Sequence, residues 1–294
     1  MDVWHIFLHS MTDCLIMLPI MFLTYIIIEL LERKTSFATN GKRLTGNGAP
    51  LVGSLIGTIP QCGVSVMSAK LFDRGIIGLG TVLSVFIATS DEALAILIAS
   101  DKRLAIIPLI AIKLVLATGV GLLFNLIMSK KKDFSGEVFE HESVCAHCHD
   151  EVSSGKNAWI KMYVFVPLFH ALQTFLYVFA VTFVFGIFFG EHGLIVEEKF
   201  AQYLSSVQYA ESFITALVGL IPNCASSAII SGAYVSGAIS FGGLVAGLIA
   251  NAGVGLAVLF KNTKEIKRNL FVLILLYLIG AFTGLFVTFV TSIL

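Results

Sequence analysis

Six long apolar stretches constrain the fold of this chain more than any other feature. They cover approximately residues 4–31, 75–99, 104–128, 159–190, 238–260 and 269–293. A helix that crosses a bilayer needs about 20 mostly apolar residues, and each stretch is long enough. Hydrophobic residues make up 57% of the 294 residues and charged residues only 13%, which is more apolar surface than one soluble core can cover. The sequence therefore predicts an all-α polytopic membrane protein.

Two further apolar regions, 49–72 and 205–235, are each interrupted by nearly the same phrase. Residues 57–62 read GTIPQC and residues 219–224 read GLIPNC, 162 positions later. About a dozen apolar residues lie on either side of each phrase, and a dozen helical residues reach only ~18 Å, a little past the middle of a bilayer. Because proline breaks a helix and removes a backbone donor, we expect each region to form a re-entrant hairpin of two half-helices.

The two phrases belong to a longer internal repeat. Residues 53–97, aligned without a gap on residues 215–259, share 14 identities in 45 positions. We expect a first transmembrane repeat at 1–128, a linker at 129–158 and a second transmembrane repeat at 159–294, with about ten helices when the half-helices are counted. The alternative is that the repeated Gly and Pro serve only close helix packing, which does not explain the polar residues beside them.

The distribution of basic residues predicts the orientation in the membrane. If the N-terminus is outside and each hairpin returns to the side it left, four segments face the cytoplasm: 32–47, 70–74, 129–161 and 260–268. They hold 15 Lys and Arg, whereas the outer segments hold only Lys102, Arg103 and Lys199, as the positive-inside rule requires. The two repeats are then inverted, both chain termini lie outside and the linker is cytoplasmic. The N-terminus has no basic region typical of a signal peptide, and we expect a multi-pass protein of the plasma (inner) membrane.

Polar residues gather at the two breaks and in the spans that follow the hairpins. Broken helices of inverted repeats form the substrate site in many secondary transporters, and irregular backbone at membrane depth is tolerated only where it is buried or lines a cavity. We therefore expect a substrate site made of Gln61, Cys62, Ser65, Asp91, Glu92, Asn223, Cys224, Ser227 and Asn251.

Asp91 and Glu92 are the acidic members of this predicted site. They follow VFIATS in what reads as an apolar helix, where a charged side chain costs at least about 2.5–3.5 kcal/mol and is usually functional or paired. The second repeat has Asn251 opposite Thr89 and no acid, as expected if one pair of carboxylates serves a cation or a proton. Solvation of both acids near the outer end of the span is the alternative.

Lys113, Asp13 and His170 are the candidates for coupling transport to protons. Lys113 lies in mid-span one helix after the acids, where its ammonium would keep an empty site neutral and be displaced by an entering cation; a Lys that snorkels to the surface is the alternative. Asp13 and His170 take corresponding places in the first spans of the two repeats. A carboxylate and an imidazole suit proton transfer, and the alternative is a histidine that is simply a packed hydrogen-bond donor.

The linker contains a second group of metal-binding residue types. Residues 141–151 read HESVCAHCHDE, a composition that binds metals such as zinc. We expect Zn²⁺ or another transition metal at His141, Cys145, His147, Cys148 and His149, and no tightly bound cofactor elsewhere. The string CAHCH also matches the attachment signature of c-type haem, which would require a location outside the cytoplasm. A polar loop without a ligand is the remaining alternative.

Four of these motifs together resemble a known family. GTIPQCG, ATSDEA, CAHCH and IPNC are similar to the ten-helix heavy-metal exporters, which are also labelled arsenic efflux permeases or manganese transporters. The resemblance covers most of the chain, and the two hairpins and the acidic motif are its most specific parts. It implies ten helices and the efflux of a metal or metalloid.

We therefore expect a membrane permease, not an enzyme, that exports a heavy-metal cation, Mn²⁺ first, in exchange for protons. Thiols at Cys62 and Cys224 with nearby carboxylates suit borderline or thiophilic metals, and carboxylate-rich coordination extends to Mn²⁺. The chain has no G-x-x-x-x-G-K-[ST] motif for direct ATP coupling. An arsenical, either arsenite or an organoarsenical, is the alternative cargo, and an intramembrane c-haem redox protein is the alternative from another class.

The expected partners are the metal or metalloid ion and the lipid bilayer. The formal net charge of the chain is zero, which argues against nucleic acid as a partner. A homo-oligomer is left open by the sequence.

Overall fold

The computed structural model describes residues 48–60, 62–73, 75–90, 93–130 and 210–293, together with single residues between 4 and 26 and between 168 and 183. The described residues are helical apart from turns and short connections, and they include no strand. The first half of the chain contributes α2 (Ala49–Gly57), α3 (Cys62–Asp73), α4 (Leu79–Ala88), α5 (Ala93–Ala99), η2 (Arg103–Ala105) and α6 (Ile106–Lys130). The second half contributes α11 (Glu211–Gly219), α12 (Cys224–Val235), α13 (Phe241–Ala250), α14 (Val254–Phe260), η4 (Thr263–Glu265) and α15 (Ile266–Ile293).

Four helical runs are long and apolar enough to cross a membrane: Leu79–Ala99, Arg103–Ile127, Phe241–Phe260 and Ile266–Ile293. They match four of the six predicted stretches. The other two, 4–31 and 159–190, fall mostly outside the described residues. Large apolar side chains of α6 and α15, such as Val115 and Phe286, are exposed, as expected for helices that face lipid.

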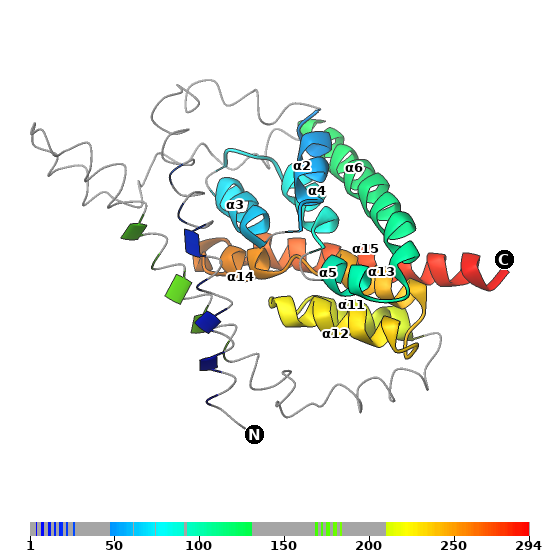
Figure 1. Ribbon diagram of the computed structural model, residues 1–294. Helices are drawn as coiled ribbons and strands as arrows, with labels where there is room; N and C mark the ends of the chain where they lie inside the picture. Colours follow the sequence, from blue (N-terminus) through cyan, green and yellow to red (C-terminus); the bar gives the residue numbers. More distant parts are fainter. Residues whose placement is uncertain are drawn as a thin grey trace, which may run out of the picture.

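The central helices of each half are buried between others. α4 packs against α2 and α6, and α13 packs against α11 and α15. The two halves also cross, because α3 packs against α14 and α12 packs against α5 (Figure 1). A half-helix from each half of the chain therefore completes the core of the other half.

The helix bounds recur at the offset of 162 residues that separates the two phrases. α2 and α11, α3 and α12, and α4 and α13 each begin and end at corresponding positions. Gly75 and Gly237 also correspond, and both have a positive φ, 68° and 82°. The amide of the residue that follows each glycine donates a hydrogen bond to the carbonyl oxygen of the residue four positions before that glycine, at 2.9 Å in both cases. Such a helix end requires a left-handed residue, which explains the glycine at both positions.

Helices break at both repeated phrases, as predicted. α2 and α11 end at the glycine of each phrase, and α3 and α12 begin at its cysteine. The helices also approach closely here, since a Cβ on Gly57 would lie 2.8 Å from the Val85 carbonyl oxygen. Gly219 meets the carbonyl of Gly247 in the same way, so glycine is required on this face of both helices.

The spans predicted at 75–99 and 238–260 are not continuous helices. α4 ends at Ala88 and α5 begins at Ala93, whereas α13 ends at Ala250 and α14 begins at Val254. Thr89 and Asn251, which correspond in the repeat, are both extended, with ψ of 134° and 98°. Neither break contains a proline. The other two breaks could be predicted from the sequence because proline interrupts a helix.

Candidate functional site

Buried polar side chains gather around the four helix breaks of the described chain. Unwound backbone leaves amide and carbonyl groups without helical partners, and in an apolar interior these groups must be satisfied by other parts of the protein. The side chains that are buried at or near the breaks are Ser65, Thr89, Ser90, Lys113, Asn223, Ser226, Ser227 and Asn251. Five of them are members of the predicted substrate or coupling sites.

Lys113 of α6 is the central charge of this region. Its side chain is only 1% exposed, so the alternative of a snorkelling surface lysine is wrong. Its Nζ donates to the carbonyl oxygen of Thr89, to Ser90 Oγ at 3.0 Å and to the carbonyl oxygen of Leu248 at 2.8 Å. Thr89 is the C-cap of α4 and Leu248 lies in the last turn of α13. One ammonium group therefore joins the C-terminal ends of two helices from the two halves of the chain.

The chemistry of helix ends explains this arrangement. The C-terminal end of a helix carries a partial negative charge and free carbonyl oxygens, and a cation there is favourable. Lys113 neutralises two such ends at once in a region that water reaches poorly. The sequence indicated a cation at this position but could not identify these carbonyl partners, because the break after Ala88 was not expected.

Asn251 stabilises the second central break locally. Its Oδ1 accepts a hydrogen bond from the Gly253 amide at 2.8 Å, and Gly253 has a φ of 55°, a conformation that favours glycine. Thr89, at the corresponding position, instead donates its hydroxyl to the Val85 carbonyl at 2.8 Å. Thr89 and Asn251 thus share an extended backbone, but their side chains satisfy different backbone groups.

Ser65 lies where the two halves of the chain cross. A Cβ on Gly255 of α14 would lie 2.7 Å from the Cβ and the backbone of Ser65 on α3, so these helices touch through their backbones. Ser227, the corresponding residue on α12, is also fully buried. Near it, Ser226 Oγ donates to the Asn223 carbonyl at 2.7 Å, which satisfies backbone at the start of α12.

Many predicted site residues lie outside the described part of the chain. They are Asp13, Gln61, Asp91, Glu92, His141, Cys145, His147, Cys148, His149 and His170, and for Cys62 and Cys224 the backbone is described but not the side chain. Among the described residues, no three His, Cys, Asp or Glu gather closely enough to hold a metal ion. The metal-ligand sets expected from the sequence therefore stay predictions.

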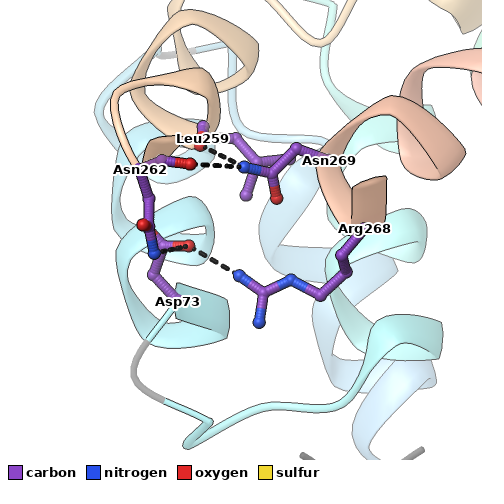
Figure 2. Close-up of polar contacts among 5 residues, drawn as sticks. All are labelled: Asp73, Leu259, Asn262, Arg268 and Asn269. Carbon is purple, nitrogen blue, oxygen red and sulfur yellow. Dashed lines mark hydrogen bonds and ion pairs between the residues drawn. The ribbon is translucent and has the colours of Figure 1, made fainter. Parts of the chain in front are cut away.

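One contact that the sequence did not reveal joins the end of α3 to the start of α15 (Figure 2). Asp73 forms an ion pair with Arg268 at 2.8 Å and accepts a hydrogen bond from Asn262 at 3.4 Å. Burial raises the pKa of the Asp73 carboxyl, and the positive charges of Arg268 and Lys70 lower it by less. Asn269 completes the contact by donating to the carbonyl of Leu259, at 2.7 Å, at the end of α14.

A second contact of the same kind holds the end of α12. Lys102 Nζ donates to the Tyr234 carbonyl at 2.6 Å and lies 4.5 Å from the centroid of the Tyr234 ring. Arg268 likewise lies 4.5 Å from the centroid of the Phe72 ring, and Phe72 and Tyr234 are 162 residues apart. At the C-terminal ends of α3 and α12, a basic side chain from the other half of the chain covers an aromatic ring, a favourable cation–π contact.

The comparison with protein families agrees with this architecture. A family described as "Putative, 10TM heavy-metal exporter" matches residues 5–172, more than half of the chain, including the first phrase, the acidic motif and the linker. Neither the curated proteins nor the solved structures give a match. The match confirms the family suggested by the motifs: this chain belongs to the ten-transmembrane heavy-metal exporters.

Proposed function

We propose that this protein is a secondary-active permease that exports a heavy-metal cation, Mn²⁺ first, in exchange for protons. Membership of a heavy-metal exporter family supports metal efflux. The observation that carries the proposal is the meeting of α4 and α13, broken helices from the two halves of the chain, at the buried ammonium of Lys113. Discontinuous helices that meet inside a membrane protein are typical of ion sites in secondary transporters.

The architecture that we propose for transport is two inverted repeats, each with a re-entrant hairpin. The recurrence of helix bounds and of left-handed glycines at one offset supports a repeat. The assignment of segments to the two sides of the membrane is supported by the contacts that Arg268 and Lys102 make. Segments 70–74 and 260–268, both assigned to the cytoplasm by charge, meet at Asp73 and Arg268, and two outer segments meet at Lys102 and Tyr234.

In the proposed cycle the metal cation enters between the hairpins and binds at the thiols of Cys62 and Cys224 with the carboxylates of Asp91 and Glu92. Sulfur and carboxylate ligands together suit borderline metals and extend to Mn²⁺. The positive charge of the metal at the acidic pair displaces the nearby Lys113 ammonium. Asp13 and His170 pass the protons that move in the opposite direction.

The alternative cargo is an arsenical. Cys62 and Cys224 are the first residues of α3 and α12 at corresponding positions of the two halves, so each half of the chain has one cysteine at a break. In this case the cysteines bind the substrate, and Asp91 matters mainly for coupling. The linker residues His141, Cys145, His147, Cys148 and His149 would bind Zn²⁺ or another transition metal in either case.

Transport by purified protein in proteoliposomes tests the proposal. Mn²⁺, Zn²⁺, Cd²⁺, Co²⁺ and arsenite are compared with and without a pH gradient, for the wild type, Asp91→Asn and the double variant Cys62→Ser/Cys224→Ser. Asp101→Asn is the matched control, because Asp101 is exposed in a turn. We expect gradient-dependent flux of a divalent metal that Asp91→Asn abolishes and Asp101→Asn leaves intact. Flux of arsenite alone, stopped only by the cysteine variant, would favour the arsenical, and no flux under any condition would overturn the proposal.

A further inference from the structure

We propose that the oxygens around the Lys113 ammonium form a monovalent-cation site, which in this structure is filled by the chain's own side chain. The ligand class is a small monovalent cation, Na⁺ or a primary alkylammonium ion. The existence of the site follows from contacts among described residues. Only its role in coupling rests on the proposed function.

Three of the oxygens that contact the Lys113 ammonium come from one helix break and one helix end. They are the carbonyl of Thr89, the hydroxyl of Ser90 and the carbonyl of Leu248. Thr89 and Ser90 are 1% and 4% exposed, so the site is closed to bulk water. Carbonyl and hydroxyl oxygens on unwound backbone and at half-helix C-terminal ends are the ligands that hold Na⁺ in transporters with broken helices.

The charge at the site favours a cation. Each helix C-terminus contributes about half of an elementary negative charge, and here the ends of α4 and α13 both approach Lys113 Nζ. A neutral occupant would leave the partial charges of both helix ends unbalanced in an apolar interior. The ends would then repel each other, and the carbonyl oxygens would lose their donor.

The occupant also connects the two halves of the chain. Thr89 and Ser90 belong to the break between α4 and α5, whereas Leu248 belongs to α13, and α4 packs directly against α13. An ammonium on a flexible stem can leave this position while the metal is bound, and a small ion can then take its place. A cation in the site therefore favours the packed arrangement of the two halves. In this structure the Lys113 ammonium has the position that a coupling ion would have.

Replacement of Lys113 by a small residue tests the site directly. The full chain carrying Lys113→Ala is unfolded by heat in detergent, in equal ionic strengths of sodium chloride, ethylammonium chloride or choline chloride. Choline is a bulkier ion that has no N–H group to donate to these oxygens, and it serves as the reference ion. We expect sodium or ethylammonium to raise the unfolding midpoint of the variant by at least about 2–4 °C relative to choline, with no such ion-specific shift in the wild type.

Two further variants keep the test decisive. Lys102→Ala is the matched control, since Lys102 also donates to a helix-end carbonyl but is only partly buried, and we expect no ion-specific shift for it. Lys113→Ser, which leaves similar space, repeats the measurement if the alanine variant is not recovered. Equal midpoints of the Lys113 variants in all three salts would overturn the inference. Because the readout involves no transport, a failed flux assay with a preserved ion-specific shift would count against the proposed function alone.

Discussion

At the residue scale, two lysine side chains of the described residues donate to backbone carbonyl oxygens at helix ends. Lys113 contacts two carbonyl oxygens and one hydroxyl, and Lys102 contacts a carbonyl and an aromatic ring. Both lie at helix C-termini, where a cation is stabilised by the helix dipole. The positions of these lysines are therefore explained by the carbonyl oxygens at helix C-termini, which need hydrogen-bond donors inside an apolar protein.

Replacement of Lys113 by methionine tests this explanation through stability. The variant keeps the length of the side chain but removes the donor, leaving two buried carbonyl oxygens unsatisfied. We expect it to lose about 2–3 kcal/mol of unfolding free energy, measured by denaturant titration in detergent. Lys267→Met, at an exposed position of α15, should stay within about 0.5 kcal/mol of the wild type. Equal losses in the two variants would contradict the role given to Lys113.

Asp73 gives a prediction about pH. Burial raises the pKa of its carboxyl in the folded protein, so the folded state binds this proton more tightly than the unfolded state does. The wild type should therefore gain stability relative to Asp73→Asn as the pH falls through the raised pKa, and this gain should be absent at higher pH. Unfolding midpoints of both proteins measured from about pH 8 to about pH 3, a range that includes the ordinary Asp value, check it. A relative loss of stability in acid would instead mean that the ion pair with Arg268 dominates.

At the element scale, the crossing of the two halves depends on close approach of helix backbones. α3 and α14 come from different halves of the chain and touch at Ser65 and Gly255. Small residues at such contacts allow helices to pack closely in a membrane, where hydrophobic burial contributes little to association. The geometry of the breaks is in turn set by how tightly these half-helices pack.

Substitution of Gly255 by alanine tests the crossing. The added methyl group would press into Ser65, and we expect a loss of about 1–3 kcal/mol of stability together with reduced metal flux. Gly119→Ala in α6 is the matched control, because a Cβ there has no neighbour within 4 Å, and it should be neutral or slightly stabilising. Thermal unfolding of both variants distinguishes them, and an unperturbed Gly255→Ala protein would show that α3 and α14 are not in contact.

The sequence predicted some of these elements well and missed others for physical reasons. Proline and cysteine in a repeated phrase located the breaks between α2 and α3 and between α11 and α12, because proline cannot continue a helix. The breaks after Ala88 and Ala250 were missed because neither contains a proline, and because the apolar residues on both sides make each stretch long enough to read as one spanning helix. The partners of Lys113 and the Asp73–Arg268 pair were also missed, since contacts between distant residues leave no local pattern.

At the scale of the whole molecule, two similar halves of the chain complete each other's core. The recurrence of helix bounds at one offset and the two basic contacts support the inverted arrangement proposed above. The sequence predicted the repeat from identities and its orientation from charge. It could not predict which half-helix crosses to which half, because that depends on packing between α3 and α14 and between α12 and α5.

The orientation predicts which positions a membrane-impermeant reagent can reach. In a protein whose native cysteines are replaced, Asp101→Cys and Thr263→Cys place single thiols at two exposed positions. We expect an impermeant maleimide to label the first in intact cells and the second only after the membrane is opened. Labelling of both in intact cells, or the reverse pattern, would contradict the proposed topology.

The most direct test of the central claim, proton-coupled metal export, is to follow metal and protons together. Proteoliposomes with a pH dye inside are given Mn²⁺ outside, and the internal Mn²⁺ and pH are recorded at once. We expect Mn²⁺ entry through the wild-type protein to be accompanied by proton exit, and we expect Asp91→Asn to abolish both while Asp101→Asn preserves both. Entry of Mn²⁺ with no change of internal pH, or proton exit that does not depend on a metal, would contradict the claim.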